Sequence, residues 1–246
     1  PCTGRTSPDL SHPSLTHRED SLPCESTFRR TLARLDADDI DARLGAWMRT
    51  KVLNVARRQV LAIDGKSLRG ADDGTRMPHL LAALTHTEGV VVAQQAVPDK
   101  GSEIPALRDL LATMDLAGVV VTADALHCQR ETADFITDAG GHYVLTVKAN
   151  QPGLRAALKN LPWSDVPGHR SHDLHHGRTV TRTVKAVEAP AWIDWPGAAQ
   201  VLQVRRTRTI KGRKHIEVVY AISSVPMTAA QPRQVASWIQ GHWGIE

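Results

Sequence analysis

The sequence predicts an α/β fold, a mixed sheet flanked by helices, from two observations. Three apolar strand-like segments are followed by alternating helices and strands between residues 60 and 161. A hairpin set followed by this alternation is typical of a mixed sheet with helices on its faces. A block of three alternating strands between residues 179 and 223 then interrupts the pattern before a last helix. The sequence therefore predicts one α/β body with a β-rich insertion.

Apolar periodicity and turn residues justify each element in order. Strands are expected at Val60–Lys66, Leu80–His86, Val90–Val97, Gly118–Asp124 and Tyr143–Lys148, and then at Thr179–Glu188, Val201–Ile210 and His215–Ser223. Helices are expected at Glu103–Met114, Gln129–Ala139 and Gly153–Leu161, and from Gln231 to Glu246. Residues 162–178 contain several Pro, Gly and His residues and are predicted to form a polar loop.

The N-terminal part is organised differently. Residues 1–24 are rich in Pro, Ser, Thr and His without an apolar period, which predicts a disordered lead-in. Helices at Ser26–Leu35 and Asp38–Met48 form a small helical element over residues 25–57, ahead of a main body over 58–246 with its insertion at about 162–226. The chain begins at Pro1 without Met and ends at Glu246 within a helical pattern, so we expect a piece of a longer protein.

Composition narrows the functional classes. In 246 residues, 30 Lys and Arg minus 26 Asp and Glu give a net charge of +4, which suits an acidic partner such as nucleic acid. Neither a run of 18 apolar residues nor a signal-peptide pattern is present in the sequence, so no membrane partner is expected. The three cysteines form no CxxC pair, which disfavours a disulfide framework or structural zinc and favours a reducing cytoplasm.

Two aspartates could carry chemistry, because Asp64 and Asp124 end apolar strand segments. A buried carboxylate costs several kcal/mol unless it is paired or binds a metal ion. The first and fourth strands are plausible neighbours, which would place both acids side by side, where a divalent cation relieves their repulsion. Two such ions about 3.5–4 Å apart can hold an in-line attack on a phosphodiester. Alternatively, Asp64 opens a turn with Gly65 and Asp124 caps the next helix; Glu246 is a candidate third acid.

Several segments carry a specific resemblance. Residues 62–70 read AIDGKSLRG, residues 121–129 read VTADALHCQ, residues 143–152 read YVLTVKANQP and residues 242–246 read HWGIE. These segments, with shorter matches between them, resemble bacterial insertion-sequence transposases of the ISAs-type group, also called H-repeat-associated proteins. The resemblance keeps its order over about residues 20 to 246.

The resemblance implies an RNase H-like DDE core. Its triad would be Asp64, Asp124 and Glu246, separated by 124 − 64 = 60 and 246 − 124 = 122 residues, the second gap holding the β-rich insertion. The triad would bind two Mg²⁺ or Mn²⁺ ions for phosphodiester hydrolysis and strand transfer. The wider group has Tyr seven and Arg four residues before this Glu, where the present chain has Ile239 and His242. The Lys expected after the Glu falls beyond residue 246.

The partner implied is double-stranded DNA, both the element ends and the target, bound by a homodimer on the nucleoid in a bacterial cytoplasm. Basic and polar residues near the acids and in the last hairpin are candidate DNA contacts, with a solvated surface as the alternative. They are Lys66, Arg69, Lys148, Asn150, Arg206, Arg208, Lys211, Arg213 and His242. Trp238 and Trp243 pack in the core or stack on a flipped base.

Two rival functions remain open. The chain could be an inactive DNA-binding remnant of such a transposase, which a stop codon directly after Glu246 would favour. It could instead be a cellular RNase H-like nuclease, against which terminal inverted repeats flanking the gene would argue.

Overall fold

The computed structural model describes residues 24–52, 59–68, 77–98, 100–175, 178–210 and 213–245. The chain divides into two compact units, Pro1–Ala37 and Asp38–Glu246. In the first unit the described helix is α1 (Glu25–Leu32), which is amphipathic and holds an i,i+4 ion pair between Arg29 and Glu25. The predicted disordered lead-in, apart from Cys24, lies outside the described residues.

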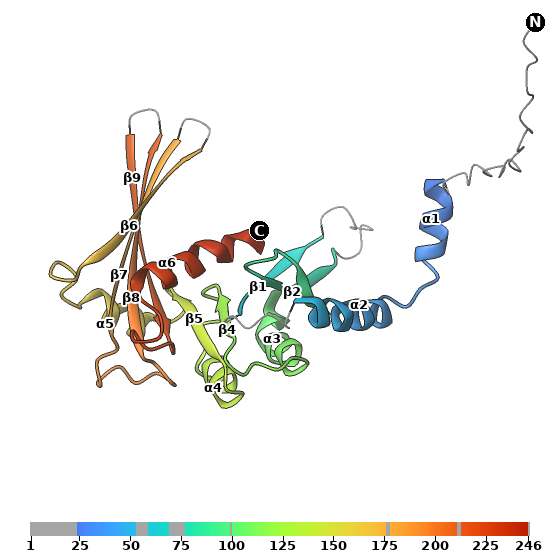
Figure 1. Cartoon of the computed structure of the whole chain (residues 1–246), viewed down its shortest axis with the longest axis horizontal. Coiled ribbons are helices and arrows are strands. Elements are labelled where there is room, and N and C mark those ends of the chain that lie inside the picture. Colours follow the sequence, from blue (N-terminus) through green and yellow to red (C-terminus); the bar gives the residue numbers. More distant parts are fainter. Residues whose placement is uncertain are drawn as a thin grey trace, which may run out of the picture. The chain divides into compact units, whose positions relative to one another are not determined.

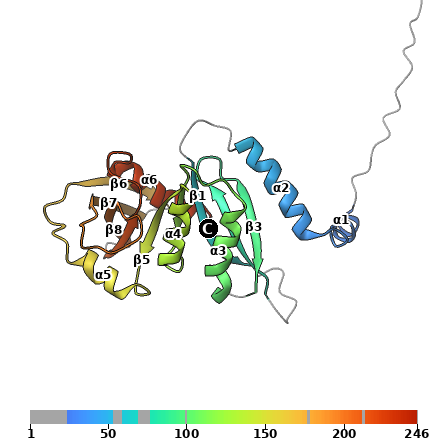
Figure 2. The same cartoon turned by 90° about the horizontal axis from the view of Figure 1, so that it is seen from below.

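The second unit is built on a nine-stranded mixed sheet with the strand order β3-β2-β1-β4-β5-β9-β8-β7-β6 (Figures 1 and 2). Its strands are β1 Val60–Ser67, β2 His79–Thr85, β3 Val91–Val97, β4 Val120–Ala123, β5 His142–Val147, β6 Gly168–His175, β7 Arg178–Glu188, β8 Gln200–Ile210 and β9 Arg213–Ser223. Its helices are α2 Ala37–Val52, α3 Glu103–Ala112, α4 Arg130–Asp138, α5 Pro152–Lys159 and α6 Pro232–Gly241, with 3-10 turns η2 Lys100–Ser102 and η3 His242–Ile245.

The first five strands have RNase H-like topology. β1 pairs antiparallel with β2, and β2 with β3, whereas β1 pairs parallel with β4 and β4 with β5. The predicted mixed sheet is therefore confirmed, and so is the expectation that the first and fourth strands are neighbours.

Both faces of this part of the sheet are covered. Because side chains alternate along a strand, Leu61 and Ile63 pack on the face covered by α3 and α4, whereas Val60 packs on the face covered by α6. Figure 1 shows α6 on one side of the central strands and α3 and α4 on the other. Asp64 has the parity of Val60, so its side chain lies on the α6 face.

The strands β6–β9 form an extension of the same sheet. β9 pairs with β5 only through Tyr220–Ser223, and the rest of β9 pairs with β8 alone. Figure 1 shows these strands running on past the central part of the sheet. The side chains of residues 213–218 are exposed.

Two predictions about this half of the chain were wrong. Residues 168–175, predicted as part of a polar loop, form strand β6 on the edge of the sheet, where backbone pairing with β7 is enough without an apolar pattern. The last α-helix ends at Gly241 rather than running to Glu246, and the chain continues as the tighter turn η3. A Cβ at position 241 would lie 2.5 Å from His86 Nδ1, so the helix end is packed closely against β2.

Among the described residues, no helix is both long and apolar enough to cross a membrane.

Candidate active site

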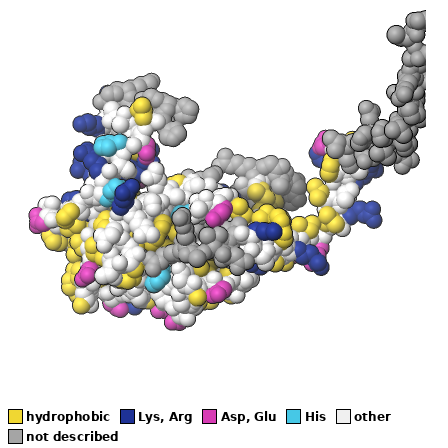
Figure 3. All heavy atoms as spheres, in the orientation of Figure 1, with side chains coloured by type: hydrophobic (Ala, Val, Ile, Leu, Met, Phe, Trp, Pro, Cys, Tyr) yellow, Lys and Arg dark blue, Asp and Glu magenta, His cyan; other side chains and the backbone are white. Residues whose placement is uncertain are grey.

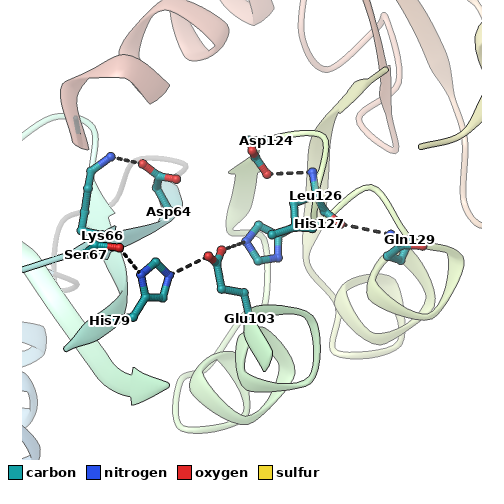
Figure 4. A network of polar contacts seen from close by, with 9 residues as sticks. All are labelled: Asp64, Lys66, Ser67, His79, Glu103, Asp124, Leu126, His127 and Gln129. Carbon is teal, nitrogen blue, oxygen red and sulfur yellow. Dashed lines mark hydrogen bonds and ion pairs between the residues drawn. The ribbon is translucent and has the colours of Figure 1, made fainter. Parts of the chain in front are cut away.

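The two predicted aspartates lie at matching positions of two adjacent parallel strands, Asp64 within β1 and Asp124 directly after β4. The β1–β4 register pairs Ile63 with Ala123, so Asp64 and Asp124 are the next residues along each strand. Neighbouring strands are about 4.8 Å apart, which brings the two residues close together. Both side chains line one cavity of about 190 Å³ on the α6 face. The sequence-based expectation that these acids lie side by side therefore agrees with the geometry (Figure 4).

Each carboxylate already has a local partner. Lys66 Nζ forms an ion pair with Asp64 Oδ2, and the Leu126 backbone N–H donates to Asp124 Oδ1 at 2.8 Å. Asp124 thus caps the turn that follows β4, not helix α4, whose N-cap is Gln129. Asp64 lies within β1, with Gly65 and Lys66 continuing the strand, so it opens no turn.

The predicted third acid, Glu246, lies outside the described residues, but the segment that leads to it is anchored. Thr122 Oγ1 lies 3.1 Å from both His86 Nε2 and His242 Nδ1. Because the Thr122 hydroxyl donates to the Leu61 carbonyl at 3.3 Å, the two histidine rings are the donors to its oxygen. Burial, and next the charge of His242, lower the pKa of His86 to about 4. η3 therefore begins beside β4, next to Asp124.

Besides the two aspartates, the cavity is lined by cationic and apolar side chains. Lys148, Arg182, Arg206 and His242 line it together with Val184, Val204, Val219 and Ile239. Two of these arginines have acidic partners: Arg182 pairs with Asp173, and Arg206 donates to Glu217 at 2.7 Å. Arg206 also lies 5.9 Å from the ring centre of Trp243. An anion entering the cavity would meet positive charge next to two carboxylates.

The structure places the predicted DNA-contact residues in three groups. Lys66, Lys148, Arg206 and His242 lie at the acids. Arg208 and Arg213 share the face of Arg206, because alternation and the β8–β9 register put them on that side of the extension. Asn150 instead donates its amide to the Ala125 carbonyl and so supports the loop after Asp124. Arg69 and Lys211 lie outside the described residues.

A buried His–Glu–His cluster beneath the acids was missed in the sequence reasoning. Glu103, the first residue of α3, is 3% exposed, and its carboxylate lies 2.6 Å from His79 Nε2 and 3.4 Å from His127 Nε2. Ser67 Oγ lies 3.0 Å from the other nitrogen of the His79 ring (Figure 4). Burial acts to raise the pKa of Glu103, but the hydrogen bonds and positive charge of His127 and His79 outweigh it and lower the pKa below its ordinary value.

The sequence held little that could have revealed this cluster. An acid in the first turn of an amphipathic helix reads as an ordinary helix start, because it complements the helix dipole. The one available signal was that His127 follows Asp124 by three residues on a loop next to the predicted site.

The acids suit a hard divalent cation. Carboxylate oxygens are the ligands that Mg²⁺ and Mn²⁺ prefer, and Asp64 is already paired with a cationic group. Within the described part of the chain, no group of three or more His, Cys, Asp and Glu residues could hold a metal ion. Glu246, the predicted third ligand, lies outside those residues.

Comparison with known proteins identifies the family. The sequence model of the family described as "Transposase DDE domain" matches residues 56–246, and the chain belongs to this family. The resemblance drawn from the sequence motifs is thereby confirmed.

Individual relatives agree with this family. The chain is 31% identical over 207 residues to the "Uncharacterized protein in dhlA 3'region" of Xanthobacter autotrophicus, covering 80% of this chain and 70% of that protein. It is 30% identical over 245 residues to "Putative transposase YncI" of Escherichia coli O157:H7, covering 93% and 62%. It is 28% identical over 246 residues to "H repeat-associated putative transposase YhhI" of Escherichia coli K12, covering 93% and 64%. The chain thus spans less than two thirds of the length of these two Escherichia coli proteins.

Among solved structures, the chain is similar to a piggyBac transposase synaptic complex with hairpin DNA. The identity is 14%, the TM-score is 0.44, and the alignment covers 90% of this chain and 46% of the other.

Proposed function

We propose that this chain is the catalytic part of an insertion-sequence transposase. It would cut phosphodiester bonds at the ends of its element and join the freed 3′-hydroxyl to target DNA. One observation carries the proposal: in a chain of the DDE transposase family, Asp64 and Asp124 directly follow paired residues of adjacent parallel strands and line one cavity. The substrate would be double-stranded DNA, which places the protein on the bacterial nucleoid.

Asp64, Asp124 and Glu246 are the residues that would hold two Mg²⁺ or Mn²⁺ ions. When bound, such ions lower the pKa of an attacking hydroxyl and neutralise charge that develops on the phosphate. The hydrogen bond from the Leu126 N–H fixes the orientation of the Asp124 carboxylate.

Cationic side chains around the acids would bind the DNA backbone. Lys66 pairs with Asp64 here, and its side chain is 39% exposed. When metal ions balance the charge of Asp64 instead, the Lys66 side chain would turn from the carboxylate to a DNA phosphate. Lys148 and Arg206 line the same cavity as the acids and would hold the phosphates that flank the cut. His242, whose Nδ1 is held by Thr122, keeps its ring at the cavity wall.

A homodimer on DNA is part of the proposal, because an element is excised only when its two ends are processed together. The arms that would bind those ends are the β6–β9 extensions. Their surface carries many Lys, Arg and His side chains, as Figure 3 shows for one face.

Strand cleavage tests the proposal. Protein expressed from the full reading frame is incubated with Mn²⁺ and double-stranded DNA that carries the ends of the element around its gene. We expect Asp64→Asn and Asp124→Asn to abolish cleavage, because each removes a charged ligand, and to leave DNA binding in a gel-shift assay nearly unchanged. Asp138→Asn, at the exposed end of α4, makes the same change away from the site and should cleave normally.

The outcomes separate the rival functions. Cleavage retained by either active-site variant would overturn the assigned role of that aspartate. DNA binding without cleavage by the wild type would favour the inactive remnant, an alternative consistent with Ile239 and His242 standing where the wider group has Tyr and Arg. Equal cleavage of unrelated DNA would favour a nuclease that recognises no element ends.

A further inference from the structure

Glu103 links the two chain segments that carry the aspartates. On one side its carboxylate contacts His79, whose ring contacts Ser67, the last residue of β1 and three residues after Asp64. On the other side it contacts His127, three residues after Asp124. α3 therefore reaches both loops with a single side chain, and Figure 4 shows Glu103 lying between them, beneath the two acids.

The close packing at Gly65 strengthens this link. A Cβ at position 65 would lie 2.5 Å from Glu103 Cδ and 2.6 Å from both of its oxygens. No side chain fits there without displacing the carboxylate, so the backbone next to Asp64 rests directly on Glu103. Gly65, Glu103 and both aspartates also line one shared cavity.

The loop that follows Asp124 is held by backbone hydrogen bonds. Besides the bond from Leu126 N–H to Asp124, Cys128 N–H donates to Ala125 O at 3.1 Å and Gln129 N–H donates to His127 O at 2.9 Å. These bonds make residues 124–129 a tight turn that holds both Asp124 and His127. The His127 side chain is 1% exposed, and its contact with Glu103 ties the turn to α3.

A buried polar cluster is a costly way to gain stability. Taking a carboxylate and two imidazoles out of water costs several kcal/mol, and apolar side chains of the same volume are often as stable or more so. Such a cluster instead fixes geometry, because ion pairs and hydrogen bonds set the distance and orientation of the groups they join more closely than apolar contacts do. The cluster lies between the two acids, where it can fix their relative position.

We infer that Glu103 is a positioning residue that, through His79, His127 and Gly65, sets the separation of the Asp64 and Asp124 carboxylates and thereby the affinity of the site for divalent ions. This inference rests on the proposed function, because it takes the two aspartates to be metal ligands. Glu103 itself touches no substrate in this scheme.

Mn²⁺ binding tests the inference with a readout other than activity. Free Mn²⁺ is followed by electron paramagnetic resonance while it is titrated into the wild type and into Glu103→Gln, which keeps the side-chain size but removes the charge. We expect the dissociation constant of the variant to rise about 10-fold or more, the range known for residues that orient metal ligands. Asp109→Asn, on the exposed face of the same helix, is the matched control and should bind as the wild type does.

A second variant tests the inference independently in case Glu103→Gln fails to fold. Gly65→Ala keeps the Glu103 charge and pushes the carboxylate away by contact, so it should weaken Mn²⁺ binding in the same direction. In cleavage assays, both variants should need more Mn²⁺ for half-maximal rate and recover most of the wild-type rate at saturation. A purely structural role would lower the saturated rate and leave the Mn²⁺ requirement unchanged.

The failures of the two proposals can be told apart. If Asp64→Asn loses Mn²⁺ binding while Glu103→Gln and Gly65→Ala bind as the wild type does, the inference about Glu103 is overturned and the metal site stands. If the wild type and Asp64→Asn bind Mn²⁺ equally, the assignment of the aspartates is overturned, and this inference with it.

Discussion

Two parts of one sheet differ in how they hold charge. In β1–β5 both faces are covered, Glu103 is 3% exposed, and the two aspartates follow fully buried strand residues. In the outer half of the β6–β9 extension, residues 213–218 of β9 are exposed and the strands hold together mainly by their own pairing. The aspartates, which would bind small metal ions, are held in place by the packed core. The basic side chains of the extension, which would bind the large and flexible DNA backbone, lie on an exposed surface.

The largest expected difference is in stability. Ile63 is fully buried beside Asp64, whereas Ile216 is 54% exposed on β9. We expect Ile63→Ala to lower the free energy of unfolding by about 2–5 kcal/mol, because it leaves a cavity in the core. Ile216→Ala should change it by no more than about 0.5 kcal/mol. Urea unfolding of the two variants measures both, and equal losses would show that the extension is packed as tightly as the core.

A smaller effect is expected on DNA affinity, where substitutions on the two faces of the β6–β9 extension should differ. Arg206 lies on the face of the acids, and its neighbour Arg205 lies on the opposite face. Arg206→Ala should weaken DNA binding several-fold, about 1 kcal/mol, and reduce the dependence of log K on log salt by about 0.9, as expected for one lost phosphate contact. Arg205→Ala is the matched control. Salt titrations of the affinity would contradict the face assignment if the two variants behaved alike.

Much of the sheet could be predicted because its strands are buried on both sides and therefore read as apolar runs. The same runs located Asp64 and Asp124, since an acid at the end of such a run is conspicuous. Strand β6 has no such apolar pattern. It lies at the edge of the sheet and pairs with β7 through backbone hydrogen bonds, which do not depend on the side-chain sequence.

Long-range packing accounts for the other differences. Ile40, Leu44 and Trp47 are spaced four and three residues apart in the predicted helix Asp38–Met48, a spacing that favours one packed face, but on α2 they remain 36%, 49% and 53% exposed. α2 instead lies against β3 through Gly45, where a Cβ would be 2.9 Å from the Val92 carbonyl oxygen. The Glu103 cluster likewise joins residues 24 positions apart in the chain, a pairing that only the fold reveals.

The central claim is that Asp64 and Asp124 hold the same divalent ions, and iron-directed backbone cleavage tests it most directly. Fe²⁺ bound in place of Mg²⁺, with ascorbate and peroxide, releases hydroxyl radicals that cut the nearest peptide bonds. The account predicts cuts near residues 64 and 124 together, suppressed by excess Mg²⁺ and lost in Asp124→Asn. Cuts at only one of these places, or cuts that Mg²⁺ does not suppress, would contradict it.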